Sequence, residues 1–363
     1  MTKTIEIENI SPYEHIIAAQ QFSLEYLAEL FEGADRFRSW DRRRRSYECR
    51  VGHELDDLKG WNIVIGFYEP STRTRFSFDI ASRNLGANVA FSDSLGFFSS
   101  VSKGESLEHT VQTLSCYGDI IIMRFSEEGD AERAVRAAEE IYRKGGNKVG
   151  IINSGDGKGQ HPTQALLDLY TIFSNQGRLN NLTIAMVGDL SRGRTVRSLS
   201  YLLGKLEIPP EDADNVTLNK LGLIRDPQNN RIIFVAHDSC QIGYDIREYL
   251  VNHRVEHELT DDLTSVLPQA DVVYMTRTQK ERFNSEDEFR RVAGRYRINS
   301  DNVKLMKESA ALMHPLPIDR KDGMEISPDV DKDHRAVYLP AQVQNGLYIR
   351  MAMLKLMQKN YHR

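Results

Sequence analysis

The chain has 363 residues, of which 40% are hydrophobic and 27% are charged. This composition is typical of a globular protein, and the length is enough for two domains with cores of their own. The formal net charge of -5 gives no overall attraction for nucleic acid, and no apolar run is long enough to span a bilayer. We therefore expect neither a nucleic-acid partner nor a membrane partner.

The amino-terminal sequence and the cysteines indicate the cellular compartment. Residues 1–17, MTKTIEIENISPYEHII, lack the apolar core and the small-residue cleavage site of a secretory signal. The three cysteines, Cys49, Cys116 and Cys240, are odd in number and widely spaced. These features predict a cytoplasmic protein with free thiols.

Six short apolar runs predict buried strands, and polar residues follow each of them. In chain order the runs are WNIVIGF, DIIIM, KVGIIN, TIAMVG, DVVYMT and AALM. Because helical patterns separate the runs, we expect parallel strands covered on both faces, with ligands at their carboxyl ends. The polar residues that follow the runs are Glu69 and Ser71, then Arg124, His161, Asp189 and Arg194, Arg277, and His314.

Two helical patterns support this α/β interpretation. Apolar residues recur with helical spacing along 196–206, as in a helix packed on a sheet. The sequence HPTQALLDLYTIFSNQG, at 161–177, has Pro162 at its first turn and Gly177 at its end. We predict that this second helix links two α/β halves.

The stretch STRTR, at 71–75, lies between the first predicted strand and helical sequence. It places hydroxyl groups, guanidinium groups and unbonded backbone N–H groups at a helix N-terminus, which favours an anion site. The alternative is an ordinary N-cap by Ser71 or Thr72 with solvated arginines. Two arginines with three hydroxyls favour phosphate, because guanidinium groups match phosphate oxygens.

Other sites for phosphates, cofactors and metals fit less well. GDGKGQ, at 155–160, lacks the Ser or Thr that follows the lysine of a P-loop, and neither it nor VGDLSRGR, at 187–194, matches G-x-G-x-x-G. His253 and His257 are four residues apart on a predicted helix but have no third ligand nearby. We interpret that helix as a solvated face and expect no metal and no dinucleotide.

Seven motifs in order resemble the aspartate/ornithine carbamoyltransferase family. They are STRTR, MRFS, HPTQALLDLYTI, VGDLSRGRTVRSL, YMTRTQKER, HPLP and QNGLYIRMAML, and they span most of the chain. Within the family the likeness is to the aspartate-specific members. Ornithine-specific members resemble the chain in the phosphate motif but carry HCLP in place of HPLP, and their SMG motif is absent from this sequence.

The resemblance implies a fold and a reaction. It implies α/β architecture with two domains, each a mostly parallel sheet flanked by helices, and a C-terminal helix that returns to the N-terminal domain. Residues 1–160 plus 342–363 would form the carbamoyl phosphate-binding domain, and 161–341 the aspartate-binding domain. The reaction would join the carbamoyl group of carbamoyl phosphate to the amine of L-aspartate, a step of de novo pyrimidine biosynthesis, without a cofactor or metal.

The resemblance also assigns the candidate site residues. Those expected to bind phosphate are Ser71, Thr72, Arg73 and Thr74. Those expected to donate toward the carbamoyl oxygen are Thr74, Arg124 and His161. Those expected to hold the carbamoyl nitrogen are Gln164 and the backbone of Pro315 and Leu316. Those expected to hold aspartate are Arg194, Thr195, Arg277 and Gln279. Without that context, Arg124 and Arg277 could be surface arginines, and His161 a structural helix-entry residue.

Further expectations concern closure and assembly. Glu69 would pair with Arg194 and Arg282 across the domain cleft and stabilise a closed form. Lys103, with Ser99, matches a loop that family members contribute to the neighbouring subunit's active site. The implied partners are the two substrates and further copies of the chain, in a homotrimer with shared active sites. The sequence leaves open whether regulatory chains bind.

The chain departs from the family pattern in three places. Ile318 follows HPLP where an arginine is common, and Arg320 is a candidate substitute. Residues 35–50 are rich in arginine, which we interpret as a solvated helix or loop. The connection from 207 to 230 is long and contains Pro-Pro, which predicts an exposed insertion.

Four hypotheses remain at the level of sequence. The first is aspartate carbamoyl transfer, and the second is a transferase of the same fold with another amine acceptor. The third is a non-catalytic subunit that binds partners through its insertions, and the fourth is a nucleotide-binding enzyme. HPLP with the YMTRTQKER motif favours the first over the second. The full set of anion-binding residues disfavours the third, and the missing glycine fingerprints disfavour the fourth.

Overall fold

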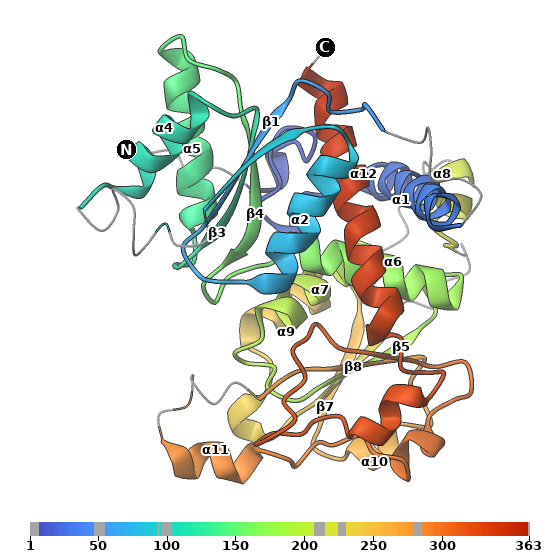
Figure 1. Ribbon diagram of the computed structural model, residues 1–363. Coiled ribbons are helices and arrows are strands. Elements are labelled where there is room, and N and C mark those ends of the chain that lie inside the picture. The colour runs from blue at the N-terminus through green and yellow to red at the C-terminus, as the bar shows by residue number, and fades with distance from the viewer. Residues whose placement is uncertain are drawn as a thin grey trace. The chain divides into compact units, whose positions relative to one another are not determined.

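The computed structural model describes residues 7–46, 55–92, 95, 104–206, 215–223, 230–278, 283 and 285–361. The chain divides into two compact units (Figure 1). Unit 1 comprises Met1–Leu166 and Asn345–Arg363, and unit 2 comprises Leu167–Gln344. Each unit contains one parallel sheet with helices, so the predicted two-domain α/β fold is confirmed.

Unit 1 is built on a four-stranded parallel sheet with the order β2-β1-β3-β4. The strands are β1 (Asn62–Phe67), β2 (Asn88–Ser92), β3 (Ile120–Phe125) and β4 (Gly150–Asp156). Helices α4 (Leu107–Ser115) and α5 (Asp130–Arg143) cover one face, and α2 (Thr72–Asn84) lies on the other (Figure 1). Alternate strand residues, such as Val64 and Ile121, enter the core beneath α4 and α5. Burial on both faces explains why β1, β3 and β4 read as continuous apolar runs.

Two long helices complete unit 1. They are α1 (Leu24–Arg45) and the C-terminal helix α12 (Val343–Tyr361). A side chain at Gly33 of α1 would meet Cβ of Ala352 at 3.0 Å, so the helices approach closely there. The Tyr348 hydroxyl donates to Oδ2 of Asp41 at 3.0 Å. Because α12 packs with the N-terminal part of the chain, the predicted return of the C-terminal helix is confirmed.

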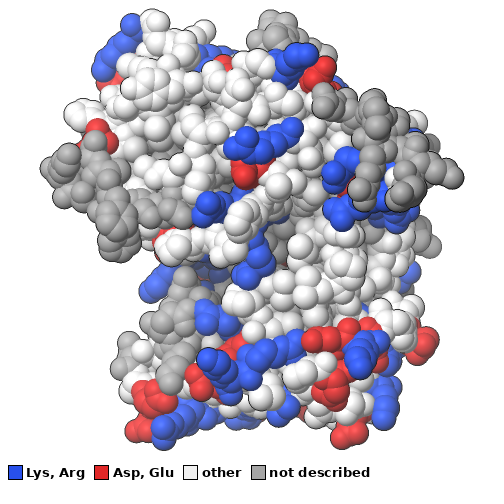
Figure 2. All heavy atoms as spheres, in the orientation of Figure 1, with Lys and Arg blue, Asp and Glu red and all other residues white. Residues whose placement is uncertain are grey.

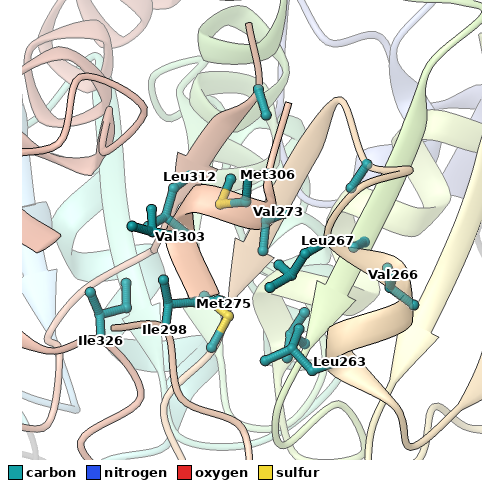
Figure 3. Close-up of a cluster of buried hydrophobic side chains, with 14 of the residues drawn as sticks. Leu263, Val266, Leu267, Val273, Met275, Ile298, Val303, Met306, Leu312 and Ile326 are labelled. Atoms are coloured by element: carbon teal, nitrogen blue, oxygen red, sulfur yellow. The ribbon is translucent and has the colours of Figure 1, made fainter. Parts of the chain in front are cut away.

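Unit 2 is built on a five-stranded parallel sheet with the order β7-β6-β5-β8-β9. Its strands are β5 (Thr183–Val187), β6 (Arg231–Val235), β7 (Glu256–Thr260), β8 (Val272–Met275) and β9 (Ala311–Met313). Its larger helices include α7 (Arg194–Gly204) and α9 (Tyr244–Asn252). On one face, side chains of β8 and β9 meet those of the segment around α10 (Leu263–Val266), as Figure 3 shows.

Helix α6 (Pro162–Gln176) begins and ends as predicted. Pro162 is its first residue, where a missing N–H costs nothing, and Gly177 follows it with φ +69°. The remaining helices are α8 (Asn215–Lys220), α11 (Glu286–Val292), the 3₁₀ helices Ile7–Asn9, Ala19–Gln21, Asp238–Cys240, Asn302–Leu305 and Pro328–Lys332, and the π-helical turn Tyr338–Gln342.

All six predicted strands are present, but the prediction omitted β2, β6 and β7. The helix predicted through His253 and His257 is wrong. Helix α9 ends before His253, its C-cap, and His257 lies in β7. Strand β7 is at the edge of its sheet and has the half-exposed sequence EHELT, so it lacks the apolar run of a central strand.

The arginine-rich segment 35–50 and the connection 207–230 both contain helical residues. The arginine-rich segment forms the end of α1 as far as Arg45, and Asp41 within it is buried and paired with Arg44 and Arg45 at 2.8 Å; residues 47–50 lie outside the described part. The insertion expected to be exposed contains α8, whose Leu218 is buried, as is Leu221 just after it. That expectation is therefore wrong for Leu218, Leu221 and Leu223, which are buried, and holds for Asn219 and Lys220, which are exposed.

The remaining general features concern charge, metals and membranes. Figure 2 shows basic and acidic residues side by side over unit 2, in agreement with ion pairs such as that of Arg295 with Asp261. Within the described residues, no group of three or more His, Cys, Asp or Glu side chains is arranged to hold a metal ion. None of the described helices combines the length and apolar character needed to cross a membrane. Cys116 and Cys240 are free thiols, and Cys49 lies outside the described residues.

Candidate active site

The predicted site residues of unit 1 follow three neighbouring strands. Strands β1, β3 and β4 are adjacent and parallel, so their carboxyl ends lie along one edge of the sheet. STRTR follows β1, Arg124 is near the end of β3, and His161 comes after β4. The sheet therefore collects these groups on one edge, where parallel sheets bind ligands.

Ser71 is the N-cap residue of α2, but its side chain makes no capping hydrogen bond. Its backbone is extended, with φ -153° and ψ 114°, and the helix begins at Thr72. The first-turn N–H groups of a helix have no acceptor within that helix, and their dipoles attract negative charge. Thr72 and Arg73 are exposed, whereas Thr74 is buried. The ordinary-cap alternative therefore lacks its defining hydrogen bond, and the arrangement fits a phosphate group.

Arg124 and Glu69 form an ion pair, with Nε of Arg124 3.3 Å from Oε2 of Glu69. The Arg124 side chain is 14% exposed and that of Glu69 is 34% exposed. The backbone holds the two segments together, because the Tyr68 N–H donates to the Arg124 carbonyl at 2.9 Å. Glu69 therefore orients the guanidinium that was predicted to polarise the carbamoyl oxygen. Arg282, one of its two predicted partners, lies outside the described residues.

His161 lies immediately before α6 and is only 4% exposed. Its Nδ1 is 3.4 Å from Oγ1 of Thr163, and its carbonyl accepts the Gln164 N–H at 2.9 Å. The loop before it is tight, because the Gln160 N–H donates to the Asp156 carboxylate and Gly157 has φ +49°. A side chain at Gly157 would meet the Ser126 carbonyl oxygen at 2.5 Å, so only glycine fits. The loop thereby fixes His161 and Gln164 at the start of one helix.

Unit 2 repeats the arrangement with strands β5, β8 and β9. These strands are adjacent and parallel, and they lead to Arg194 and Thr195, to Arg277, and to Pro315 and Leu316. Gly188, after β5, has φ +116°, and a side chain there would meet Oγ1 of Thr276 at 2.7 Å. Three of the predicted aspartate-binding residues, Arg194, Thr195 and Arg277, and the HPLP backbone therefore come from neighbouring strand ends.

The loop before Arg194 is held by the 3₁₀ helix Asp238–Cys240, which follows β6. The Leu190 and Ser191 N–H groups donate to the Cys240 carbonyl at 2.9 and 3.0 Å. The Arg192 guanidinium lies 3.4 Å from Oδ1 of Asp189 and donates to the Cys240 sulfur at the same distance. Burial, with the nearby Asp189 carboxylate, raises the pKa of the Cys240 thiol. Cys240 is thus a neutral structural group of this loop.

Arg277 interacts electrostatically with Asp319, which lies in the loop after HPLP. Burial opposes ionisation of Asp319, but N–H groups of Lys321, Gly323 and Asp322, together with Arg277, lower its pKa. Asp319 is therefore a carboxylate that accepts N–H bonds at 2.8 to 3.1 Å. This negative group was not singled out from the sequence.

The positions after HPLP depart from the family pattern in a defined way. Ile318 packs against the apolar core cluster of unit 2. The Arg320 guanidinium donates to both Asp331 carboxylate oxygens, at 2.7 and 2.9 Å, and to the Ile326 carbonyl at 2.6 Å. Arg320 is therefore engaged with Asp331, which gives no support to its suggested replacement of the missing arginine.

Leu316 has a left-handed backbone with φ +59°, and its peptide bond to Pro317 is cis. Its N–H donates to Nδ1 of His314 at 2.8 Å, and Nε2 of His314 is 3.0 Å from Oε1 of Glu325. A second group of buried side chains meets the main chain of His314. The residues of that group are Gln342, Asp168 and Tyr274, joined by hydrogen bonds in this order, and the half-buried Thr195 side chain hydrogen-bonds to Tyr274.

Four predicted site residues lie outside the described part of the chain: Ser99, Lys103, Gln279 and Arg282. Conversely, the sequence analysis did not single out Asp168, Asp319 or Glu325. Asp168 lies inside the HPTQALLDLYTI motif, where an acid among apolar residues was a usable signal. Glu325 is eleven residues beyond His314, and no local pattern links the two residues.

The two units thus form an α/β protein whose strand ends present guanidinium, hydroxyl and imidazole groups, as a transferase of anionic substrates requires. A family described as aspartate/ornithine carbamoyltransferase, carbamoyl-P binding domain, matches residues 14–174. The companion family, described as the Asp/Orn binding domain, matches residues 226–357. The chain belongs to the aspartate/ornithine carbamoyltransferase family.

Individual relatives agree with this assignment. The chloroplastic aspartate carbamoyltransferase of Oryza sativa subsp. japonica is 42% identical over 343 residues, which cover 94% of this chain and 84% of the relative. The catalytic subunit of M. jannaschii aspartate transcarbamoylase is similar in structure, with a TM-score of 0.79 and 35% identity over 96% of this chain and 99% of that one. The Trypanosoma cruzi aspartate transcarbamoylase in complex with carbamoyl phosphate and aspartate has a TM-score of 0.76 and 33% identity over 94% and 96%.

Proposed function

We infer that this enzyme transfers the carbamoyl group of carbamoyl phosphate to the amino group of L-aspartate. The products are N-carbamoyl-L-aspartate and phosphate, a step of de novo pyrimidine biosynthesis. The observation that carries the inference is the high identity to aspartate carbamoyltransferases over nearly the whole chain. The Trypanosoma cruzi aspartate transcarbamoylase has been solved in complex with carbamoyl phosphate and aspartate, which supports the same pair of substrates here.

The residues after β1 are proposed to bind the phosphate group. Ser71, Thr72, Arg73 and Thr74 offer hydroxyls, a guanidinium and the first-turn N–H groups of α2. Thr74, Arg124 and His161 are proposed to donate toward the carbamoyl oxygen. Attack by an amine places negative charge on that oxygen, and fixed donors lower the barrier by stabilising it.

The residues of unit 2 are proposed to hold the acceptor and the carbamoyl nitrogen. Arg194, Thr195, Arg277 and Gln279 supply cations and donors for the two carboxylates of aspartate. Gln164 of unit 1 and the backbone of Pro315 and Leu316 are proposed to accept the N–H groups of the carbamoyl nitrogen. The rate enhancement then comes from orientation of the substrates and stabilisation of the oxyanion. A phosphate oxygen of the substrate is proposed to take the amine proton.

The assembly and compartment are further parts of the proposal. We propose a homotrimer in which Lys103 and Ser99 enter the neighbouring subunit's site, and closure that uses Glu69, Arg194 and Arg282. Residues 1–160 with 342–363 are proposed to bind carbamoyl phosphate, and 161–341 to bind aspartate. We propose a cytoplasmic enzyme, which the free thiols Cys116 and Cys240 support, whereas the rice relative is chloroplastic.

The function is tested by phosphate release from carbamoyl phosphate with different amine acceptors. We expect release with L-aspartate, no comparable release with ornithine, and full activity without added metal. The carbamoylated product is identified by mass spectrometry. Equal or faster turnover with ornithine would overturn the acceptor assignment. Loss of activity with a chelator, restored by a metal, would overturn the metal-free mechanism.

A further inference from the structure

We propose that His314 is a positioning residue that orients the Pro315–Leu316 backbone toward the amino group of carbamoyl phosphate, with Glu325 fixing the imidazole. This inference rests on the proposed function, in which that backbone holds the carbamoyl nitrogen. It assigns a task to two buried side chains that do not themselves contact substrate.

The hydrogen bonds determine which nitrogen of His314 carries the proton. A backbone N–H can only donate, so Nδ1, which lies 2.8 Å from the Leu316 nitrogen, must be the acceptor. The proton of the neutral ring is therefore on Nε2, which donates to Oε1 of Glu325 at 3.0 Å. If Nδ1 carried the proton, it would face the Leu316 N–H, and two donors cannot form a hydrogen bond. The geometry thus requires one tautomer, and Glu325 is the group that selects it.

The ring is held firmly on both sides. His314 is 1% exposed and Glu325 is 3% exposed, so water cannot replace either partner at low cost. Oε1 of Glu325 also accepts the Asp319 N–H at 3.0 Å, so one carboxylate oxygen joins both ends of the turn that begins at HPLP. The His314 N–H donates to Oε1 of Gln342 at 3.0 Å, and Nε2 of Gln342 donates to buried Asp168 at 2.6 Å.

Fixing the Leu316 N–H fixes the two carbonyl groups around it. The peptide between Pro315 and Leu316 is planar, so its carbonyl points away from the N–H that His314 holds. The same bond restrains φ of Leu316, which is +59° and therefore in a region that a leucine rarely occupies. Such a conformation persists only where surrounding contacts impose it. Loss of the His314 contact would let both carbonyls turn away from the carbamoyl nitrogen.

A substrate analogue isolates this effect. Acetyl phosphate has a methyl group where carbamoyl phosphate has an amino group, so it cannot donate to a backbone carbonyl. The inhibition constant of acetyl phosphate against carbamoyl phosphate therefore reports all binding except the interaction proposed for Pro315 and Leu316. The ratio of that inhibition constant to the KM of carbamoyl phosphate, here named the amino-group preference, reports the interaction itself.

Two substitutions of His314 separate the effects of its two side-chain hydrogen bonds, because each variant keeps one bond and loses the other. In His314→Asn, the amide oxygen takes the place of Nδ1 and keeps the Leu316 bond, but the contact with Glu325 is lost. In His314→Gln, the longer side chain reaches Glu325 in place of Nε2, but the Leu316 bond is lost. Both variants place a polar amide in the same buried site. His237→Gln is the matched control, because Nδ1 of His237 also accepts an N–H two residues later, from Ser239 at 3.2 Å.

We expect His314→Gln to lower the amino-group preference about tenfold, which corresponds to one lost hydrogen bond. His314→Asn and His237→Gln should retain the preference to within about threefold. Circular dichroism and thermal unfolding establish that each variant is folded. Equal preferences in His314→Gln and His314→Asn would overturn the inference, because a purely structural histidine would affect both substrates alike.

A variant of Glu325 tests the inference independently, in case neither His314 variant folds. Glu325→Leu removes the group that keeps the proton of His314 on Nε2, so Nδ1 can carry the proton and lose the Leu316 N–H, and the same selective loss of amino-group preference is expected. His314→Asn differs because its amide has no tautomer for Glu325 to select. An unchanged preference in folded Glu325→Leu would overturn the role of Glu325. Failure of the proposed function has a different signature, because the unmodified enzyme would then not form carbamoyl aspartate at all.

Discussion

Arg124 combines partial burial with an ion pair, and it is the single residue best suited to test oxyanion stabilisation. We expect Arg124→Ala to lower kcat by about 100-fold or more, as for the loss of one oxyanion donor, with a smaller change in KM. The reason is that charge on the carbamoyl oxygen is greatest in the transition state. Steady-state kinetics with both substrates varied provides the measurement.

Arg83→Ala is the control for Arg124, because Arg83 is an exposed arginine of the same unit and pairs with Asp79 at 2.8 Å. It should have near-normal kinetics, since exposed pairs contribute little. A kcat for Arg124→Ala close to that of the unmodified enzyme would remove Arg124 from the catalytic assignment.

Arg277 is proposed to hold a carboxylate of aspartate, and its neighbour Asp319 adds a competing negative charge. We expect Arg277→Ala to raise the KM for aspartate at least tenfold, about 1.4 kcal/mol of binding, and to slow turnover. The KM for carbamoyl phosphate should change less. Arg295→Ala, which removes an exposed pair with Asp261, serves as the control. Similar effects on both KM values would contradict an acceptor-specific role.

At the scale of elements, the segment before α1 is attached to β4 and carries a pH-sensitive contact. Ile16 pairs with Ile152, and Nδ1 of His15 accepts the Ile151 N–H at 3.1 Å. Burial lowers the pKa of His15 from 6.5 to about 4. The unfolded chain therefore binds a proton at higher pH than the folded protein does. The free energy of unfolding should consequently fall as the pH decreases from about 6.5 to 4.

His15→Asn keeps an acceptor for the Ile151 N–H but cannot titrate. We expect it to remove up to about 3 kcal/mol of the pH-dependent loss of stability between pH 6.5 and 4. Urea unfolding at a series of pH values measures the difference, with His109→Asn on the exposed surface of α4 as the control. Parallel pH curves for His15→Asn and the unmodified protein would show that His15 makes no contribution.

Burial, more than position within the sheet, explains which strands could be predicted from the sequence, because the edge strands β4 and β9 are buried and were predicted. Strands β1, β3, β5 and β8 are central and buried, so continuous apolar runs reveal them. Strands β2 and β7 are edge strands with mixed sequences, and the prediction omitted them. It also omitted β6, although Ile232–Val235 is apolar. The helix assigned through His253 and His257 was wrong because a four-residue spacing alone does not distinguish a helix from a turn that leads into a strand.

The candidate site was predictable where a motif marks a strand end, and not where distant residues support it. STRTR, Arg124 and HPLP each follow an apolar run that is visible in the sequence. The hydrogen bond between His314 and Glu325, and the electrostatic influence of Arg277 on Asp319, depend on how a loop folds back on itself. Tertiary packing brings these residues together, and no short sequence pattern marks them. They could therefore not be predicted from a single sequence.

At the scale of the whole molecule, the proposed shared site makes a prediction about mixed assemblies. Lys103→Ala and Arg73→Ala should each be nearly inactive as pure proteins, because every site then lacks one phosphate-binding cation. In a mixed trimer, a chain that retains Lys103 can meet a chain that retains Arg73 and form an unmodified site. Dissociating, mixing and reassociating the two inactive proteins should therefore restore part of the activity.

The control for this experiment is each inactive protein dissociated and reassociated alone, which should gain no activity. Mass spectrometry of the intact assemblies verifies that mixed trimers have formed. Verified mixed trimers that remain as inactive as their parents would refute the shared site, because a lysine that serves its own chain's site cannot be complemented.

The close packing of α12 on α1 has a consequence for synthesis. The face of α1 around Gly33 is covered by Ala352, which the ribosome adds only after all of unit 2. At about 5–20 residues per second, translation of residues 167–344 takes roughly 10–40 s. During that interval the nascent chain presents the α1 face without its partner helix, while unit 2 is already free to fold. We therefore expect unit 1 to become resistant to protease on the ribosome later than unit 2, although most of unit 1 is translated before unit 2.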